Sequence, residues 1–303
     1  MSIHKIVSNL SLQILKMQTK RLQWTLLAVL SLIWGSSFIL IKKGLIGLSP
    51  YQLGALRIIF TSLFLLLNGF KSITEIKMHQ WKYIAITALF GTFIPAFLFA
   101  IAETKVSSSI CSILNSLTPL NTLIIGFAAF GLSFKRSQFI GILIGLIGTA
   151  ILIFNGKQES SDNNYYAILV IIASFCYAIN VNLIKKLLSD VKPLSITTGN
   201  FVVLLAPALA VLLSTDFITI SALPQTQHAM LYIMVLGIVG TGIANICFFK
   251  LIQISSPVFA SSVTYLIPIV AFFWGLLDNE MLTPFQFFGA SVILIGVYLA
   301  NKK

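Results

Sequence analysis

Residues 91–119 read GTFIPAFLFAIAETKVSSSICSILNSLTP, and residues 240–268 read GTGIANICFFKLIQISSPVFASSVTYLIP. The two stretches align without a gap: they share the opening Gly-Thr, an Ile, a Phe, two serines and the closing Leu-x-Pro. A match at a fixed offset within one chain indicates an internal duplication.

The duplication extends beyond these two stretches. The segment Leu-Ile-Lys-Lys occurs at 40–43 and again at 183–186, and each copy has a proline eight residues after its first lysine, at Pro50 and Pro193. Further along, Gln138, Gly141 and Gly148 correspond to Gln286, Gly289 and Gly296. The two halves of the chain therefore carry the same elements in the same order.

The composition identifies the environment of these elements. Of 303 residues, 57% are hydrophobic and only 9% are charged, whereas soluble domains carry about 25% charged residues. A chain of this length cannot bury such an apolar excess in its own core. This excludes ordinary soluble enzymes and disordered proteins, and it predicts an integral membrane protein.

A transmembrane helix needs about 20 mostly apolar residues. The sequence contains ten such segments, at 24–42, 51–68, 83–102, 107–130, 138–154, 166–185, 195–213, 229–250, 257–277 and 285–300. We predict an all-α fold of ten transmembrane helices in two five-helix repeats. The expected divisions are a cytoplasmic N-terminal segment (1–20), a first repeat (21–155), a linker (156–164) and a second repeat (165–303).

Five helices per repeat is an odd number, so equivalent helices must cross the membrane in opposite directions. Such inverted repeats are typical of secondary transporters, in which a site near the membrane midplane lies between the repeats. The alternative is a duplication that serves packing alone. The pattern favours transport.

The basic residues predict the orientation. With the N-terminus inside, fifteen Lys and Arg residues lie on the cytoplasmic side, and four, Lys42, Lys43, Lys105 and Lys157, lie opposite. The positive-inside rule then places both termini in the cytoplasm. This explains the net charge of +12 better than nucleic-acid binding does. The first 20 residues could form an amphipathic helix on the membrane surface, or translation could begin at Met17.

Three motifs resemble the EamA family of the drug/metabolite transporter superfamily. They are Trp-Gly-Ser-Ser-Phe at 34–38, the Ser-rich helix with a proline at 107–119 and again at 255–268, and Glu-Met-Leu-Thr-Pro-Phe-Gln-Phe-Phe-Gly at 280–289. The resemblance covers about residues 20–301. It implies a cavity lined by the first, third, fourth, sixth, eighth and ninth helices. One departure is Leu132, which stands in the first repeat where the second has Glu280.

Polar side chains inside apolar segments should face the bundle interior, because facing lipid is costly. Trp34 and Ser37 in the first segment align with Tyr177 and Asn180 in the sixth. The expected substrate contacts are Trp34, Ser37, Thr92, Asn115, Tyr177, Asn180, Thr241, Asn245 and Tyr265. Close helix packing is the alternative role for the serines and threonines among the polar stripes.

Three further residues are expected to act in hinging or gating. Pro119 and Pro268 should break the fourth and ninth helices, because a proline leaves backbone carbonyls without their helical donors. Arg57 lies about 10 Å along the second helix from Pro50. It could snorkel outward, pair with Glu103 or meet an anionic substrate; a structural or gating role is favoured.

Acidic and histidine residues all fall in loops or at segment ends. The sequence therefore predicts uncoupled transport or exchange of a neutral or zwitterionic solute, since proton-coupled carriers usually keep such a residue within the membrane. No P-loop occurs. Cys111, Cys176 and Cys247 lie in apolar runs without metal-ligand spacing.

The predicted protein is a monomeric inner-membrane transporter that is not an enzyme. It should need no cofactor or metal, bind no nucleic acid, and interact with the lipid bilayer and a small-molecule substrate. The expected cargo is an amino acid or related metabolite, moved outward. Import of a nutrient or a nucleotide-sugar-like solute, and a non-transporting scaffold, are the alternatives.

Overall fold

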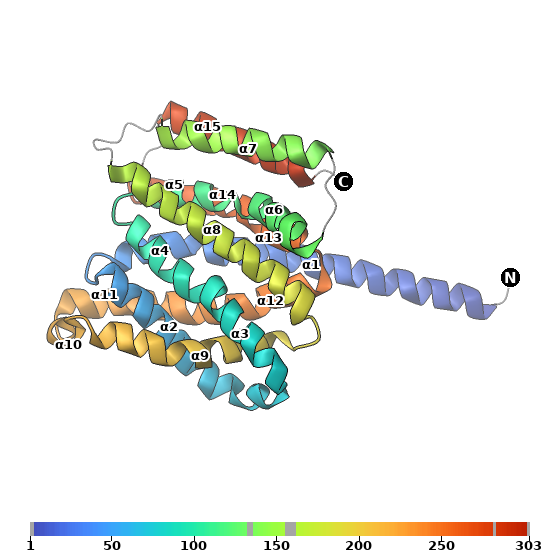
Figure 1. The fold of residues 1–303 in the computed structure, drawn as a ribbon, viewed down its shortest axis with the longest axis horizontal. Helices are drawn as coiled ribbons and strands as arrows, with labels where there is room; N and C mark the ends of the chain where they lie inside the picture. The colour runs from blue at the N-terminus through green and yellow to red at the C-terminus, as the bar shows by residue number, and fades with distance from the viewer. Residues whose placement is uncertain (1–2, 132–135, 155–161, 281–282, 302–303) are drawn as a thin grey trace.

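The computed structural model describes residues 3–131, 136–154, 162–280 and 283–301. Within these ranges the secondary structure is entirely helical (Figure 1). Eight helical segments are long and apolar enough to cross a membrane. They are Met17–Gly44, Pro50–Glu75, Met78–Ala102, Ser108–Phe130, Tyr165–Leu187, Pro193–Leu213, Pro224–Ile254 and Pro257–Leu277.

The described residues of the first half form ten helical elements. They are α1 (Ile3–Gly44), α2 (Pro50–Gly69), η1 (Phe70–Glu75), η2 (Met78–Gln80), α3 (Trp81–Ala88), η3 (Leu89–Phe93), α4 (Ile94–Ala102), α5 (Ser108–Asn115), α6 (Thr118–Phe130) and α7 (Arg136–Phe154).

The second half follows the same order in its longer helices and differs in its short elements. Its elements are α8 (Asp162–Leu187), α9 (Pro193–Leu213), α10 (Phe217–Ile220), α11 (Pro224–Val235), η4 (Leu236–Ile243), α12 (Ala244–Ile254), α13 (Pro257–Ser261), η5 (Ser262–Tyr265), α14 (Ile267–Leu277) and α15 (Pro284–Asn301).

The irregular elements recur at equivalent places. A π-helical segment interrupts the third membrane segment of each half, as η3 between α3 and α4 and as η4 between α11 and α12. The fourth segment is broken in each half, between α5 and α6 and around η5. The predicted all-helical, two-repeat fold is confirmed.

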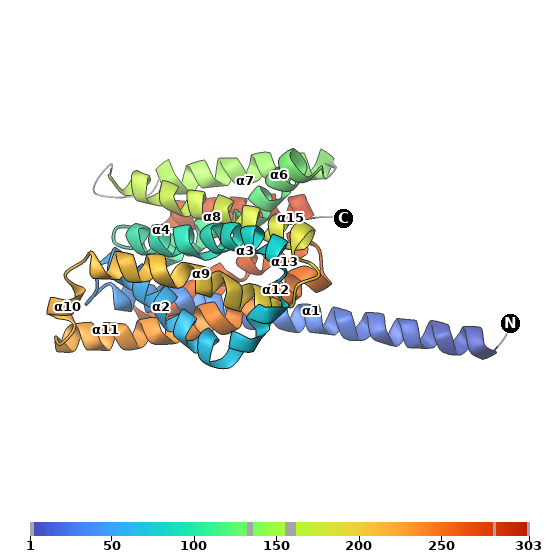
Figure 2. The same cartoon turned by 60° about the horizontal axis from the view of Figure 1, so that its bottom comes forward.

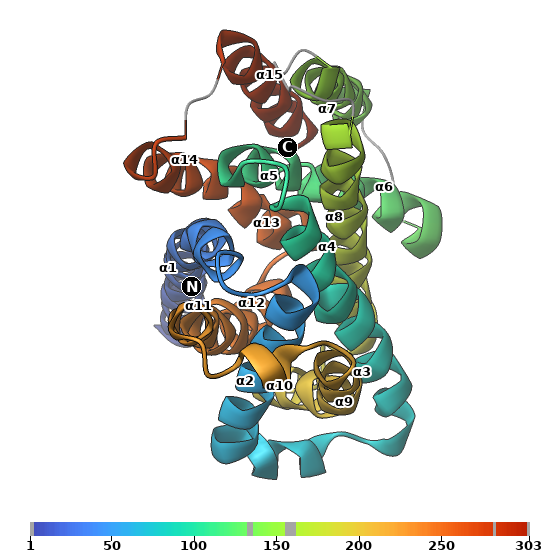
Figure 3. The same ribbon diagram turned by 90° about the vertical axis from the view of Figure 1, so that its left-hand side faces the viewer.

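The halves pack against each other through equivalent helices. Helix α2 packs on α9, and α7 lies beside α15 at one edge of the bundle (Figures 1 and 3). Helices α7 and α15 occupy the positions of the fifth and tenth predicted spans. They are not among the eight segments above, so a total of ten crossings stays a prediction.

Helix starts follow from local capping. Ser49 Oγ accepts a hydrogen bond from the Gln52 backbone N–H, and the Ser49 N–H donates to Gln52 Oε1, ahead of Pro50 in the first turn of α2. The Ser107 and Ser256 hydroxyls each accept from a backbone N–H in the first turn of α5 and α13 in the two halves. Such caps satisfy backbone donors that lipid cannot.

Helix α1 is continuous over 42 residues, about 63 Å at 1.5 Å per residue. Its N-terminal part extends beyond the bundle (Figures 1 and 2). Within Ile3–Gly44 no break separates the N-terminal segment from the first span, so the structure does not show it as a separate surface helix.

Candidate functional site: a polar cavity between the two halves

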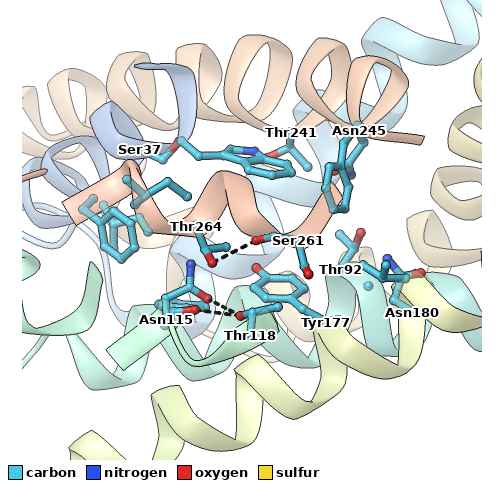
Figure 4. A pocket seen from close by; sticks show the side chains of 18 of the residues that line it. Ser37, Thr92, Asn115, Thr118, Tyr177, Asn180, Thr241, Asn245, Ser261 and Thr264 are labelled. Atoms are coloured by element: carbon cyan, nitrogen blue, oxygen red, sulfur yellow. Dashed lines mark hydrogen bonds between the residues drawn. The ribbon is translucent and has the colours of Figure 1, made fainter. Parts of the chain in front are cut away.

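A cavity lies where the two halves meet (Figure 4), with about 820 Å³ of empty space including its open mouth. Its walls come from α1, α2, η3, α4, α5, α6, α8, η4, α12, α13, η5 and α14. The lining residues are Trp34, Ser37, Phe38, Ile41, Arg57, Gly91, Thr92, Phe99, Asn115, Thr118, Tyr177, Asn180, Val181, Thr241, Asn245, Phe248, Ser261, Thr264 and Ile267.

Each half makes an equivalent contact with the other half beside this cavity. The Trp34 Nε1–H donates to the Gly240 carbonyl at 2.9 Å. Ser37 lies against Gly240, and its equivalent Asn180 lies against Gly91. A Cβ at Gly240 would come within 2.9 Å of Ser37 Oγ, and one at Gly91 within 2.6 Å of Asn180 Cγ. A side chain at either glycine would therefore push Ser37 or Asn180 out of its present position.

Arg57 projects from α2 into the cavity wall and is only 9% exposed. Its Nε–H donates to Thr241 Oγ1 at 2.7 Å, and Thr241 in turn donates to the Leu236 carbonyl at 3.1 Å. Of the described residues that line the cavity, Arg57 alone carries a formal charge. The cavity therefore has a fixed positive centre.

Two buried oxygens in the lining have no hydrogen-bond partner among the described residues, Thr92 Oγ1 and Asn180 Oδ1. Buried polar atoms are normally hydrogen-bonded, and leaving one unpaired costs about 1–3 kcal/mol. An unpaired atom in a cavity wall is one that a bound solute or water can satisfy.

The remaining wall is apolar and largely aromatic. Trp34 packs edge-on against Phe248 at 4.8 Å between ring centroids. Phe99 lies 5.7 Å from Phe38 and stacks with Tyr177 at 6.1 Å. Apolar walls with a few placed polar groups are the usual build of small-molecule sites.

The broken fourth segments contribute polar groups from both halves. Thr118 Oγ1 donates to the Asn115 carbonyl at 2.7 Å and also lies 3.2 Å from Asn115 Oδ1, while Thr264 donates to the Ser261 carbonyl at 3.0 Å (Figure 4). Ser112, on the same broken segment, donates to the Ser109 carbonyl and does not line the cavity.

The structure thus brings together eight of the nine expected contacts, all except Tyr265. Tyr265 is half-buried in η5 and packs against the hydrophobic core. The 3₁₀ turn there has 3.0 residues per turn instead of 3.6, and Thr264 and Ser261 line the cavity instead. Pro119 and Pro268 begin α6 and α14 just after the breaks and lie outside the lining.

Several lining residues were not expected from the sequence. Phe99 and Phe248 coincide in the repeat alignment, a signal that could have identified them. Thr118 lies in the break itself, where helical spacing no longer predicts the face. Ile41, Val181 and Ile267 are apolar, and nothing in the sequence separates them from core residues.

A cluster of charges closes the end of the bundle near the α1 C-terminus, the predicted outer end. Lys42 pairs with Asp278 at 2.7 Å and with Glu280 at 2.8 Å, and Lys43 also pairs with Asp278. Hydrogen bonds from Lys42 and Lys43 lower the pKa of Asp278. We call Lys42, Lys43, Asp278 and Glu280 the outer ionic cluster.

Glu280 also caps α5. Its carboxylate accepts hydrogen bonds from the backbone N–H groups of Ser108 and Ser109, at 3.4 and 3.2 Å, and from the Ser109 hydroxyl at 3.0 Å. The cluster therefore ties α1, α5 and the α14 C-terminus together. Leu132, the counterpart of Glu280, lies outside the described residues.

Glu103 lies at a segment end, as expected from the sequence, but it is buried there. It is 9% exposed at the end of α4, its Oε2 accepts from the Ser108 hydroxyl at 3.0 Å, and its Oε1 has no partner among the described residues. Burial raises the pKa of Glu103 well above its usual value. The loop folds inward there, which residue position alone does not reveal.

On the opposite end, Lys185 takes the place that Lys42 has in the first repeat. Its Nζ donates to the carbonyls of Ile252, Gln253 and Ser255 at 2.6 to 3.1 Å and so caps the α12 C-terminus. A cation at a helix C-terminus is favourable because it meets the negative end of the helix dipole. Ion pairs therefore join the helices at one end of the bundle, and a lysine bound to backbone carbonyls joins them at the other.

Two inverted helical halves around a polar cavity define a multi-pass membrane protein of the transporter class. The sequence matches the EamA-like transporter family twice, over residues 22–154 and 164–302. The chain therefore belongs to the EamA-like transporter family, and it is a transporter of the drug/metabolite transporter superfamily.

Similar proteins span nearly the whole chain. An uncharacterized transporter of Archaeoglobus fulgidus is 26% identical over 287 residues, 93% of this chain and 99% of that protein. The uncharacterized inner membrane transporter YedA of Escherichia coli K12 is 28% identical, over 91% of this chain and 89% of its own. A probable amino-acid metabolite efflux pump of Salmonella typhimurium is 25% identical, over 88% and 90%.

A solved crystal structure shares the fold. It superposes with a TM-score of 0.64 at 16% identity, and the match covers 94% of this chain and 97% of the other. At this identity the likeness concerns the fold alone.

Proposed function

We propose that this transporter exports a small organic metabolite, an amino acid or related compound, through the cavity between its halves. The observation that carries the proposal is the lining itself: Trp34 and Tyr177, Ser37 and Asn180, and Thr92 and Thr241 are equivalent positions of inverted repeats that converge on one space. A site shared by inverted repeats can be opened to either side by rocking one half against the other.

In alternating access, the outer ionic cluster would open and close one end of the bundle, and the helix breaks would act as hinges. The cluster holds α1, α5 and α14 together at one end. The breaks before Pro119 and Pro268 let the two parts of each fourth segment change angle. Alternating access then consists of opening the cluster while the opposite end closes.

Export from the cytoplasm across the inner membrane is the proposed direction and location. The inner membrane placement of YedA and the efflux named for the Salmonella relative support it. The excess of Lys and Arg on one side supports a topology with both termini in the cytoplasm.

We keep uncoupled transport or exchange as the proposed mode, although Glu103 is buried. Its carboxyl group does not line the main cavity, so solute binding does not require its titration. Transport that stays strictly dependent on a pH gradient after Glu103→Gln and Glu280→Gln would rule out the uncoupled mode.

Extracellular metabolite profiling of cells that overproduce the protein tests the proposed function. The wild type should enrich at least one solute outside relative to empty-vector cells, and Trp34→Ala and Asn115→Ala should abolish the enrichment. Membrane content measured for each variant separates loss of transport from loss of protein. Enrichment that survives both substitutions would refute the cavity as the route.

A further inference from the structure

We propose that Arg57 is the solute-binding cation of the cavity, and that the cavity therefore selects solutes that carry a carboxylate. This inference rests on the transport function proposed above and adds the residue that recognises the cargo and the group of the cargo that it requires. It also replaces the sequence-based preference for a structural or gating role of Arg57.

The Arg57 guanidinium has no counter-charge bound to it among the described residues. Arg57 is buried, and among the described residues no carboxylate lies within ion-pair distance of it. Burying an isolated charge is costly unless an opposite charge compensates it. A cation that lines a cavity and lacks an ion-pair partner is therefore suited to an anionic group of the solute.

Glu103 is the acid that could have compensated Arg57. Its Oε2 is instead bonded to the Ser108 hydroxyl, and it lies beside a separate cavity with Lys42, Lys105 and Glu280. The other titratable groups facing it include Arg57 and Cys111. Arg57 and Glu103 act on each other electrostatically, but the two side chains form no ion pair.

The Arg57 guanidinium is held through one of its nitrogens. Thr241 accepts its Nε–H, and this is the hydrogen bond that the guanidinium makes to described residues. The two terminal amino groups of the guanidinium stay available. Such a planar fork binds a carboxylate through two parallel hydrogen bonds, a stronger and more directional contact than a point charge gives.

The position equivalent to Arg57 in the second repeat carries no charge. The counterpart of Arg57 is Asn200, which is fully buried and bonded to Thr87 at 3.1 Å, away from the cavity lining. The second repeat thus uses this position for packing with a neutral amide. Of the two equivalent positions, only Arg57 is charged and lines the cavity, as expected if Arg57 binds the solute.

The unpaired oxygens in the same cavity complement the cation. Thr92 Oγ1 and Asn180 Oδ1 can each accept a hydrogen bond. A solute with an ammonium or other N–H group beside its carboxylate would satisfy both ends of the site. The predicted class is therefore amino acids and related zwitterions, and simple amines lack the group that Arg57 requires.

Binding to the purified full-length protein tests this, with the twenty L-amino acids and their carboxamides as probes and thermal stabilisation as the readout. The wild type should bind at least one acid about tenfold or more tightly than its carboxamide, because hydrogen bonds to charged groups carry the difference. Arg57→Met should bring the ratio near one, and Arg57→Lys should retain part of it. Lys185→Met, which removes a cation outside the cavity, should keep the wild-type ratio.

Equal binding of acid and carboxamide by the wild type would overturn the inference, as would an unchanged ratio in Arg57→Met. If Arg57→Met does not fold, the ratio of acid to carboxamide affinity in Arg57→Lys and in the wild type still tests the role of Arg57. If no probe binds, the solutes found by extracellular profiling provide the test. Export of solutes without a carboxylate would then refute the role of Arg57 and leave the transport function standing. No exported solute at all refutes both.

Discussion

Thr87 and Thr92 lie on the same membrane segment and show how position decides what a buried hydroxyl does. Thr87 donates to the Ile84 carbonyl at 3.0 Å and bonds Asn200, so its hydroxyl holds helices together. Thr92, five residues later in η3, lines the cavity, and its hydroxyl oxygen has no partner in the part of the chain that the structure describes. The same residue type serves packing at one site and is left for the solute at the other.

Thr92→Val is the residue-scale test of this difference. The substitution keeps the shape and removes an unpaired hydroxyl, so the melting temperature should stay equal or rise while transport falls, by up to about tenfold for one lost hydrogen bond. Thr87→Val is the matched control: it should lower the melting temperature and leave transport per folded molecule unchanged. Loss of stability without loss of transport in Thr92→Val would contradict the assignment.

Glu103 makes a prediction about pH. Its pKa is raised in the folded protein, so between the ordinary Glu value and the raised value the folded state binds more protons than the unfolded state. Stability from this group is therefore full at low pH and lost as pH rises through the raised pKa. Melting temperatures of the wild type should fall across this window, and Glu103→Gln should flatten the fall. Glu75→Gln, which removes an exposed carboxylate, should show the same fall in melting temperature as the wild type. Identical profiles for all three proteins would contradict the burial of Glu103.

At the scale of elements, the break between α5 and α6 has an identifiable cause. Pro119 has no N–H to donate to the Asn115 carbonyl four residues earlier. The Thr118 hydroxyl takes that carbonyl instead, at 2.7 Å. The break thus exposes Asn115 and Thr118 to the cavity, which links the kink directly to the site.

Pro119→Ala restores the missing donor and should let α5 and α6 approach a continuous helix. We expect slower transport with folding retained, measured as the export rate per protein molecule, and the same from Pro268→Ala in the other half. Unchanged rates in both variants would count against these breaks as hinges.

Glu280→Gln tests the outer ionic cluster. The amide loses the ion pair with Lys42 and accepts more weakly from the N–H groups of Ser108 and Ser109. Amide hydrogen exchange across 106–112 should become faster. The equivalent start of α13, capped locally by Ser256, should exchange as in the wild type. Unaltered exchange across 106–112 would show that Glu280 does not hold this end closed.

For the whole molecule, the repeat and the apolar lengths were sufficient to predict an all-helical fold in two inverted halves. Most of the expected residues also line the cavity, because polar side chains in membrane-spanning helices are costly when they face lipid and so face the interior of the bundle. Tyr265 does not, since a 3₁₀ turn changes the face that follows from helical spacing. The burial of Glu103 depends on how a loop packs against Ser108, which neither periodicity nor position encodes.

Passage of solute through the cavity between the halves can be tested by blocking the cavity chemically. Transport of an exported solute is measured in proteoliposomes, before and after a maleimide modifies Asn245→Cys in a protein whose three native cysteines are replaced by alanine. We expect modification to abolish transport in this variant and to leave the cysteine-free parent unaffected. Full modification with undiminished transport would contradict it.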